Sequence, residues 1–147
     1  YQVVTLPLYD EDSPEKMAKI AGQLHDADYV IVFTNRVYGT IPRLTERYPL
    51  GSKYHELLFS GKLGFEMVYC ATSYPSFLGV TFMDDTFTRS KLPVPEGMDI
   101  CSPGGIIIDM GFADETFTVF DHPMSMVFGK VTDLTQGEII DLLISSQ

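Results

Sequence analysis

The sequence predicts an α/β fold: a single domain, residues 1–147, with a mixed β-sheet and about three helices. Two observations carry this prediction. Helix-period and strand-like apolar patterns alternate along the chain, and prolines and glycines separate them. A length of 147 residues with 45% apolar composition is enough for one hydrophobic core and argues against disorder.

The first elements are expected to form an N-terminal β–α–β unit. Residues 2–8 favour a strand, and residues 12–27 favour a helix in which Ser13 caps the start and Pro14 takes the first helical position. The continuous apolar run at 28–35 is typical of a strand that is covered on both faces. Two strands joined by one helix usually run parallel in the same sheet.

The middle of the chain is expected to supply another helix and two more strands. A short helix is predicted at 52–60, ended by Gly61. Residues 65–74 and 77–85 are the third and fourth predicted strands. The segment at about 86–112 is rich in proline and glycine, so we expect an irregular insertion, with one further strand at the sequence IIIDM.

The C-terminal region is expected to form an antiparallel hairpin followed by a helix. The segments ETFTVF and MSMVFGKV would be the strands, with a turn at Asp121-His122-Pro123. In the last helix, Thr135 and Glu138 have the spacing of a capping box, in which each side chain bonds the backbone of the other residue.

The charge of the chain excludes one large class of function. There are 20 acidic and 10 basic residues, a net charge of −10 at pH 7. We expect no nucleic-acid binding, because neutralising phosphates requires an extended basic surface. The two cysteines, Cys70 and Cys101, lack metal-ligand spacing. They could pair in an oxidising compartment, but two small buried hydrophobic side chains is the favoured interpretation.

Familiar signatures of cofactor, phosphate-loop, hydrolase and zinc sites are absent, so no catalytic residue, metal ligand or cofactor is predicted. Asp121 beside His122 could be a base with its orienting carboxylate, but a hairpin turn is the favoured interpretation. An independent hydrolase of phosphorylated or glycosylated small molecules would need four side chains to converge in one cleft: Asp84, Asp109, Asp121 and His122.

One basic stretch stands out in this acidic chain. From 36 to 62 there are five basic residues against two acidic ones, a net +3. The stretch follows a predicted strand, and ligands in open α/β sheets bind beyond the carboxyl ends of strands. Arginine binds phosphate bidentately, so the candidate ligand contacts are Asn35, Arg36, Tyr38, Arg43, Arg47 and Tyr48. The favoured interpretation is that the three arginines mainly fix the 36–50 loop.

Three stretches together resemble a known family: ADYVIVFTNRVYGTIPRL at 27–44, RYPLGSKYHELLFSGKLGFEMV at 47–68 and DETFTVFDHPMSMVF at 114–128. They are similar to the soluble, extracytoplasmic C-terminal region of large bacterial membrane glycosyltransferases. These polytopic proteins are related to the protein mannosyltransferases and use polyprenyl-phosphate-linked sugars. The resemblance extends over roughly half of the chain and keeps the order of the motifs. The insertion at 86–112 departs from the family pattern.

The resemblance implies an accessory domain on the extracytoplasmic face of the cytoplasmic membrane, without catalysis of its own. Its partner would be the transmembrane portion of the same polypeptide, where the catalytic acid lies in a loop between membrane helices. The domain would shape the acceptor side, and the parent would bring it a sugar acceptor or the polyprenyl-phosphate-linked sugar. Further residues match the family pattern without an assigned role: Tyr54, Asp121 and His122.

Two further features of the sequence bear on its function. The strand-like start of the chain, YQVVTLPLYD, fits a piece of a longer protein. Exposed tyrosines and methionines would also suit a protein-interaction module, which is a third interpretation beside the accessory domain and the independent hydrolase. The absence of an apolar surface patch of more than about a few hundred Å² would count against that module.

Overall fold

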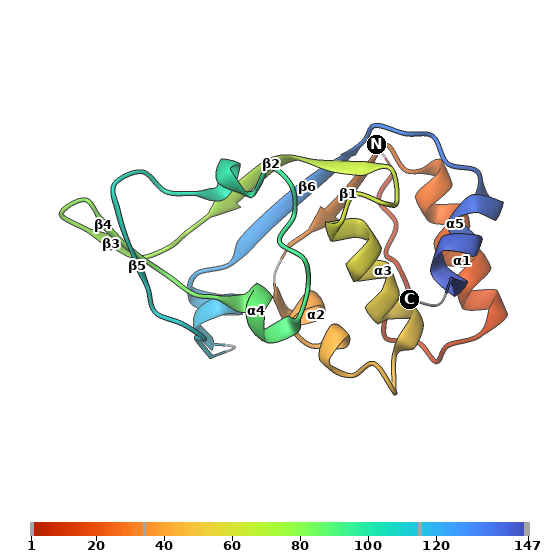
Figure 1. Ribbon diagram of the computed structural model, residues 1–147, viewed down its shortest axis with the longest axis horizontal. Coiled ribbons are helices and arrows are strands. Elements are labelled where there is room, and N and C mark those ends of the chain that lie inside the picture. Colours follow the sequence, from red (N-terminus) through yellow and green to blue (C-terminus); the bar gives the residue numbers. More distant parts are fainter. Residues whose placement is uncertain (1, 34, 115, 146–147) are drawn as a thin grey trace.

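The computed structural model describes residues 2–33, 35–114 and 116–145, and its mixture of helices and sheets confirms the predicted α/β class. Figure 1 shows a body of helices packed on one sheet, from which a second, smaller sheet projects as an arm. The body sheet, sheet A, has the strand order β1-β6-β2, and the arm sheet, sheet B, has the order β3-β4-β5. Thr34 and Glu115, which fall in predicted strands, lie outside the described residues.

Sheet A is antiparallel throughout. Its central strand β6 (Met124–Lys130) lies between β1 (Tyr29–Val32) and β2 (Phe65–Thr72). Side chains on a strand alternate between the two faces, and one face of sheet A is fully buried, as Met126 and Phe128 show. This inner face forms the floor of the hydrophobic core.

Three helices pack on the inner face: α1 (Pro14–Asp26), α3 (Pro49–Phe59) and α5 (Gln136–Ile144). They share one core with the sheet, which includes Ile20, Leu24, Tyr54, Leu58, Met126, Phe128, Ile139 and Leu143. The predicted caps are confirmed. The Ser13 side chain accepts a hydrogen bond from the Lys16 backbone, and Thr135 and Glu138 form the capping box.

The opposite face of sheet A is exposed along β1 and β2 in the described part of the chain. Tyr29 and Ile31 of β1 alternate with buried neighbours and are exposed, so the prediction of a strand covered on both faces is wrong. A register shift between Met67 and Tyr69 marks a β-bulge in β2, which leaves both Val68 and Tyr69 exposed on this face.

The arm is a mixed sheet. Strands β3 (Ser76–Phe77) and β4 (Val80–Met83) form a hairpin, and β5 (Ile106–Asp109) pairs with β4 in parallel. A tight turn at Leu78-Gly79 therefore splits the fourth predicted strand. The 86–112 segment is partly regular: it contains α4 (Thr86–Ser90), η2 (Met98–Cys101) and β5.

The predicted N-terminal β–α–β unit is wrong. Residues 2–8 form no strand, and β1 runs antiparallel to its neighbour β6. Pro7 has no backbone N–H to offer a ladder, and the Leu8 carbonyl accepts a hydrogen bond from the side chain of Lys16 at 3.1 Å. The segment packs through Leu6 and Leu8 on the core without joining the sheet.

The predicted C-terminal hairpin is also wrong. Thr116–Asp121 forms a π-helical turn, η3, in which the backbone N–H of His122 donates to the carbonyl of Phe117 at 2.7 Å. Asp114 caps this turn, because its carboxylate accepts from the Phe117 backbone at 3.0 Å. With its expected partner helical, β6 pairs instead with β1 and β2.

The two cysteines form a disulfide. Cys70 of β2 and Cys101 of η2 are joined, with their Cα atoms 5.2 Å apart. The favoured interpretation of two unpaired hydrophobic side chains is therefore wrong, and the alternative of a disulfide holds. The bond ties the 86–112 segment to the edge of sheet A.

Candidate functional site

The basic stretch after β1 forms two short helical turns, α2 (Asn35–Tyr38) and η1 (Ile41–Arg43), which lead into α3. Tyr38, Ile41 and Pro42 are buried here. Backbone hydrogen bonds close the turns, among them Gly39 to Asn35 at 2.6 Å and Tyr48 to Leu44 at 2.9 Å. Backbone bonds and buried side chains thus fix the path of this loop.

The arginines of the loop point outward. Arg36, Arg43 and Arg47 are all exposed. The Arg47 guanidinium lies 5.2 Å from the ring centre of Tyr48. The Arg43 side chain makes no hydrogen bond or ion pair with the residues that the structure describes. The interpretation that the arginines hold the loop together is therefore wrong for Arg43.

Two of the predicted tyrosines are core residues. Tyr38 stacks on Phe87 with ring centres 5.7 Å apart and meets the edge of Phe59 at 5.6 Å. Tyr54 is buried in α3 beside His55, and burial raises its pKa far above the usual value. Packing accounts for both side chains, whereas Tyr48 is half-buried and contacts the ring edge of Tyr9.

A small polar cluster lies where the arm meets the body. It contains Tyr38, Tyr74, which lies two residues after β2, and Asp84, which directly follows β4. Burial, and then the nearby Asp84 carboxylate, raise the pKa of Tyr74 to about 12. Burial, followed by the charges of Tyr74 and Asp84, also raises the pKa of Tyr38. Both phenols therefore stay protonated at neutral pH, so they can donate hydrogen bonds but cannot act as bases.

Asp121 and His122 do not form a catalytic pair. His122 Nδ1 lies 2.5 Å from the backbone carbonyl of Ser73, and the imidazole ring packs on Phe117 at 4.6 Å. Asp121 is exposed at the end of η3. The histidine thus joins η3 to the end of β2, which is a structural task.

The cleft required for an independent hydrolase is not evident. The four side chains Asp84, Asp109, Asp121 and His122 line neither the groove described next nor the small cavity beside Phe128. Within residues 2–33, 35–114 and 116–145, no group of three His, Cys, Asp or Glu side chains is placed to hold a metal ion. The geometry does not favour this alternative.

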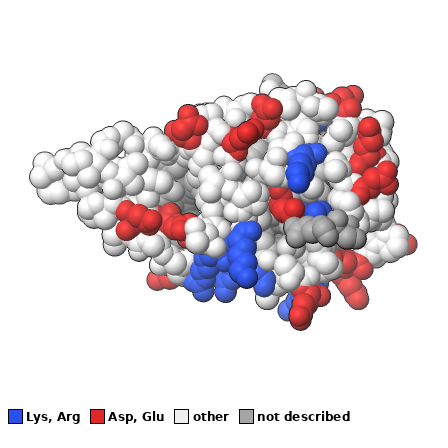
Figure 2. All heavy atoms as spheres, in the orientation of Figure 1, with Lys and Arg blue, Asp and Glu red and all other residues white. Residues whose placement is uncertain are grey.

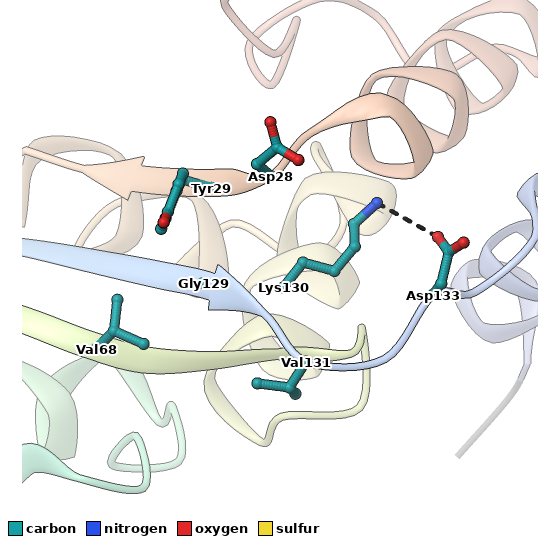
Figure 3. A pocket seen from close by; sticks show the side chains of 7 residues that line it. All are labelled: Asp28, Tyr29, Val68, Gly129, Lys130, Val131 and Asp133. Carbon is teal, nitrogen blue, oxygen red and sulfur yellow. Dashed lines mark ion pairs between the residues drawn. The ribbon is translucent and has the colours of Figure 1, made fainter.

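An open groove of about 470 Å³ lies at the end of sheet A nearest α1. Figure 3 shows Tyr29 and Val68 facing each other across Gly129. A Cβ atom at residue 129 would come within 3.1 Å of Val68 and 3.6 Å of Tyr29, so glycine keeps the floor open. Lys130 donates to the His25 carbonyl and lies 3.6 Å from Asp133. Because the Lys130 ammonium is already bonded to other groups of the protein, the groove offers no evident catalytic group among the described residues.

Charge is distributed unevenly over the surface. Figure 2 shows Lys and Arg side chains gathered over α2 and α4, where Arg36, Arg89 and Lys91 lie. Asp and Glu side chains occur over much of the body, and the end of the arm carries no charge in this view. The basic patch extends the predicted Arg36 site toward α4, which sequence spacing had not linked to it.

Two apolar surfaces are exposed. The first, here called the outer face, is the uncovered side of sheet A with Tyr29, Ile31, Phe33, Val68 and Tyr69. The second is the arm, with Phe77, Leu78, Ile106, Ile107 and Ile108. Sequence reasoning missed the outer face because its residues are as apolar as the core residues that alternate with them.

No family model matches the chain, and no curated protein or solved structure matches it significantly. In the described part of the chain, no helix is long and apolar enough to cross a bilayer.

Proposed function

We propose that this chain is a non-catalytic accessory domain of a membrane-embedded glycosyltransferase, located on the extracytoplasmic side. The main support for this proposal is the exposed apolar surface of the outer face. A solvated antiparallel sheet usually presents polar side chains on its open side, whereas here five large apolar side chains are exposed. Contiguous apolar surface of this kind marks an interaction site. Its occupant in this proposal is the transmembrane portion of the same polypeptide.

The disulfide supports the proposed extracytoplasmic location. Disulfides persist in oxidising environments such as the bacterial periplasm and are rare in the cytosol. Cys70 and Cys101 join two separate segments of the fold, so the bond belongs to the folded structure. This agrees with the extracytoplasmic location that the three family-like stretches imply.

The sugar-transfer step belongs, in this proposal, to the membrane portion. The residues described here offer packing, hydrogen-bond donors and a basic patch, without a nucleophile–base pair. Asn35 and Arg36 share α2 with Tyr38 of the polar cluster, and this part of the surface would face the acceptor or the phosphate of the lipid-linked sugar. Arginine suits such a phosphate because its fork forms two parallel hydrogen bonds.

Crosslinking in membranes tests the proposal. The complete reading frame is produced with a photo-reactive phenylalanine at Ile31 on the outer face, and separately at Lys19, which is exposed on α1. We expect position 31 to crosslink to a membrane helix of the same polypeptide and position 19 not to do so. A reading frame without membrane helices would refute the proposal.

Activity gives a second test. Ile31→Glu should lower sugar transfer by the complete protein by about tenfold or more, because it places an unpaired charge in the contact. Lys19→Glu is the matched control and should leave transfer unchanged. Equal melting temperatures of the two variants as isolated chains would show that folding is not the cause. Transfer by the isolated 147-residue chain would contradict the accessory role.

A further inference from the structure

The end of the arm is the most exposed apolar part of the molecule away from the N-terminal segment. The arm tip consists of Phe77, Leu78, Gly79 and Ile106. Leu78 is 86% exposed, Phe77 72% and Ile106 66%. The backbone N–H of Ile106 donates to the Gly79 carbonyl at 3.0 Å, so the β5 end and the hairpin turn form one structural unit. These side chains contribute little to the core of the fold.

The turn residue Leu78 has no conformational reason to be leucine. Leu78 has φ +49° and Gly79 has φ +79°, the pattern of a type I′ hairpin turn. Asn-Gly is the preferred pair in such turns, because asparagine tolerates the left-handed conformation, which is unfavourable for leucine. A residue that strains the turn and stays in solvent points to a role outside folding.

Polarity changes along the arm. Residues 67–83 and 100–108, which include every strand residue of the arm except Asp109, contain no Asp, Glu, Lys or Arg. Charges begin only at the base, with Asp84 after β4 and Asp109 ending β5. Figure 2 shows this as an uncharged projection beside a charged body. The projection is thus apolar at its end and charged only where it meets the body, as an element that enters an apolar layer end-first must be.

We propose that the arm tip inserts into the interfacial layer of a lipid bilayer. A lipid bilayer is fluid and can adapt to a convex apolar projection, whereas a protein interface buries a packed core within a polar rim. The free edge of β5 limits the depth, because unpaired backbone groups are not tolerated in the hydrocarbon region. Insertion would therefore reach the headgroup and upper acyl region, as amphipathic anchors do.

This inference rests on the arm alone and is independent of the glycosyltransferase proposal. The arm tip carries no charge, and the chain as a whole has a net charge of −10, so attraction to anionic lipids is not expected to be the main force. Apolar insertion should instead make binding insensitive to salt, and phosphatidylcholine vesicles should bind at least as well as vesicles containing phosphatidylglycerol.

Sedimentation with phosphatidylcholine vesicles tests the tip. Leu78→Asn removes the apolar side chain and suits the turn, so the fold is kept. We expect it to weaken partitioning by about tenfold or more, since each buried methylene favours membrane binding. Val3→Asn is the matched control, because Val3 is 87% exposed on the N-terminal segment and lies outside the arm. It should leave partitioning unchanged.

Fluorescence reports the position directly, because the chain contains no tryptophan. Phe77→Trp places the only tryptophan at the tip, and Val3→Trp places the only one outside the arm. With several millimolar lipid, the tip variant should shift to shorter wavelength and be quenched by lipids with brominated acyl chains. The control should show neither change.

Three results would overturn the inference. The first is the absence of a spectral shift and of quenching for Phe77→Trp. The second is equal partitioning of Leu78→Asn and the unaltered chain. The third is a dimer that Leu78→Asn dissociates in vesicle-free solution, with no vesicle binding by the unaltered chain, which would assign the tip to a second copy.

Discussion

Lys16 is the charged side chain that ties the N-terminal segment to the body. It is 5% exposed, and its ammonium donates to the carbonyls of Leu8 and Asp10 and to the carboxylate of Asp12, at 3.1, 2.7 and 2.6 Å. The same carboxylate accepts from the backbone of Leu50 at the start of α3, at 2.8 Å. One buried lysine thus holds the N-terminal segment, and the carboxylate it pairs with contacts the start of α3.

Replacing this lysine should destabilise the fold. We expect Lys16→Met to lower the free energy of unfolding by about 2–4 kcal/mol, because two carbonyls and a carboxylate lose their donor. Arg43→Met is the matched control and should change it by less than about 0.5 kcal/mol, as exposed side chains usually do. Urea unfolding of both variants measures the difference. Equal effects would refute the contrast.

His55 links stability to pH. Burial lowers its pKa to about 4, although Nδ1 donates to the Gly51 carbonyl at 2.6 Å. The unfolded chain, with a pKa near 6.5, binds the proton first as pH falls. The stabilisation is therefore complete above pH 6.5 and is lost between 6.5 and 4, by about 3 kcal/mol.

Urea unfolding from pH 7 to pH 4 measures this loss. His55→Gln is the reference variant, because its amide keeps a donor for Gly51 but does not titrate. We expect the stability advantage of histidine to shrink as pH falls. Backbone hydrogen bonds lower the pKa values of Glu15 and Glu138. Their effect on stability at low pH is the same in both proteins, so it cancels in the difference. Parallel pH profiles would rule out a buried neutral histidine.

At the scale of elements, the side-chain caps of α1 and α5 were predicted correctly, whereas strand pairing was not. Ser13 and the Thr135–Glu138 box located the starts of α1 and α5, because caps act within one turn of the chain. Residues 115–120 have a strand-like composition, yet Asp114 caps a π-helical turn there. Whether such a segment joins a sheet depends on distant partners, which one sequence does not reveal.

The candidate site shows the same contrast: local positions were predictable from the sequence, and contacts between distant segments were not. The position of Asn35 and Arg36 after β1 was predictable from the apolar run that precedes them. The proximity of Tyr38 to Tyr74 and Asp84 depends on where segments distant in the sequence meet, and no spacing in the sequence indicates it. The disulfide was left as an alternative for the same reason: its two cysteines lie 31 residues apart on unrelated elements.

Removal of this disulfide should loosen the link between β2 and the 86–112 segment. A crosslink that closes a loop of this length contributes about 3–4 kcal/mol by restricting the unfolded chain. Cys70→Ala with Cys101→Ala should lose about that much free energy of unfolding, measured in urea. A count of free thiols in the unaltered protein is the control. Two reactive thiols after export to an oxidising compartment would contradict the bond.

At the scale of the whole molecule, burial is concentrated in the body. β6 is hydrogen-bonded on both sides and covered by three helices, whereas all four residues of β5 are exposed. Figure 1 shows the arm pointing away from α1 and α5. Local opening of the arm therefore uncovers little apolar surface and should cost far less than unfolding the body.

Hydrogen exchange resolves this difference. Backbone amides of β4 and β5 should exchange about a hundredfold faster, or more, than those of β6, because the arm opens without the core. Lys16→Met provides the internal test: it lowers the global free energy of unfolding, so β6 amides should speed up while arm amides stay unchanged. If β5 amides were as slow as those of β6, or accelerated equally in Lys16→Met, arm and body would unfold as one unit. If phosphatidylcholine vesicles slowed the exchange of arm amides that exchange rapidly in water, this would show that membrane contact at the tip stabilises the arm.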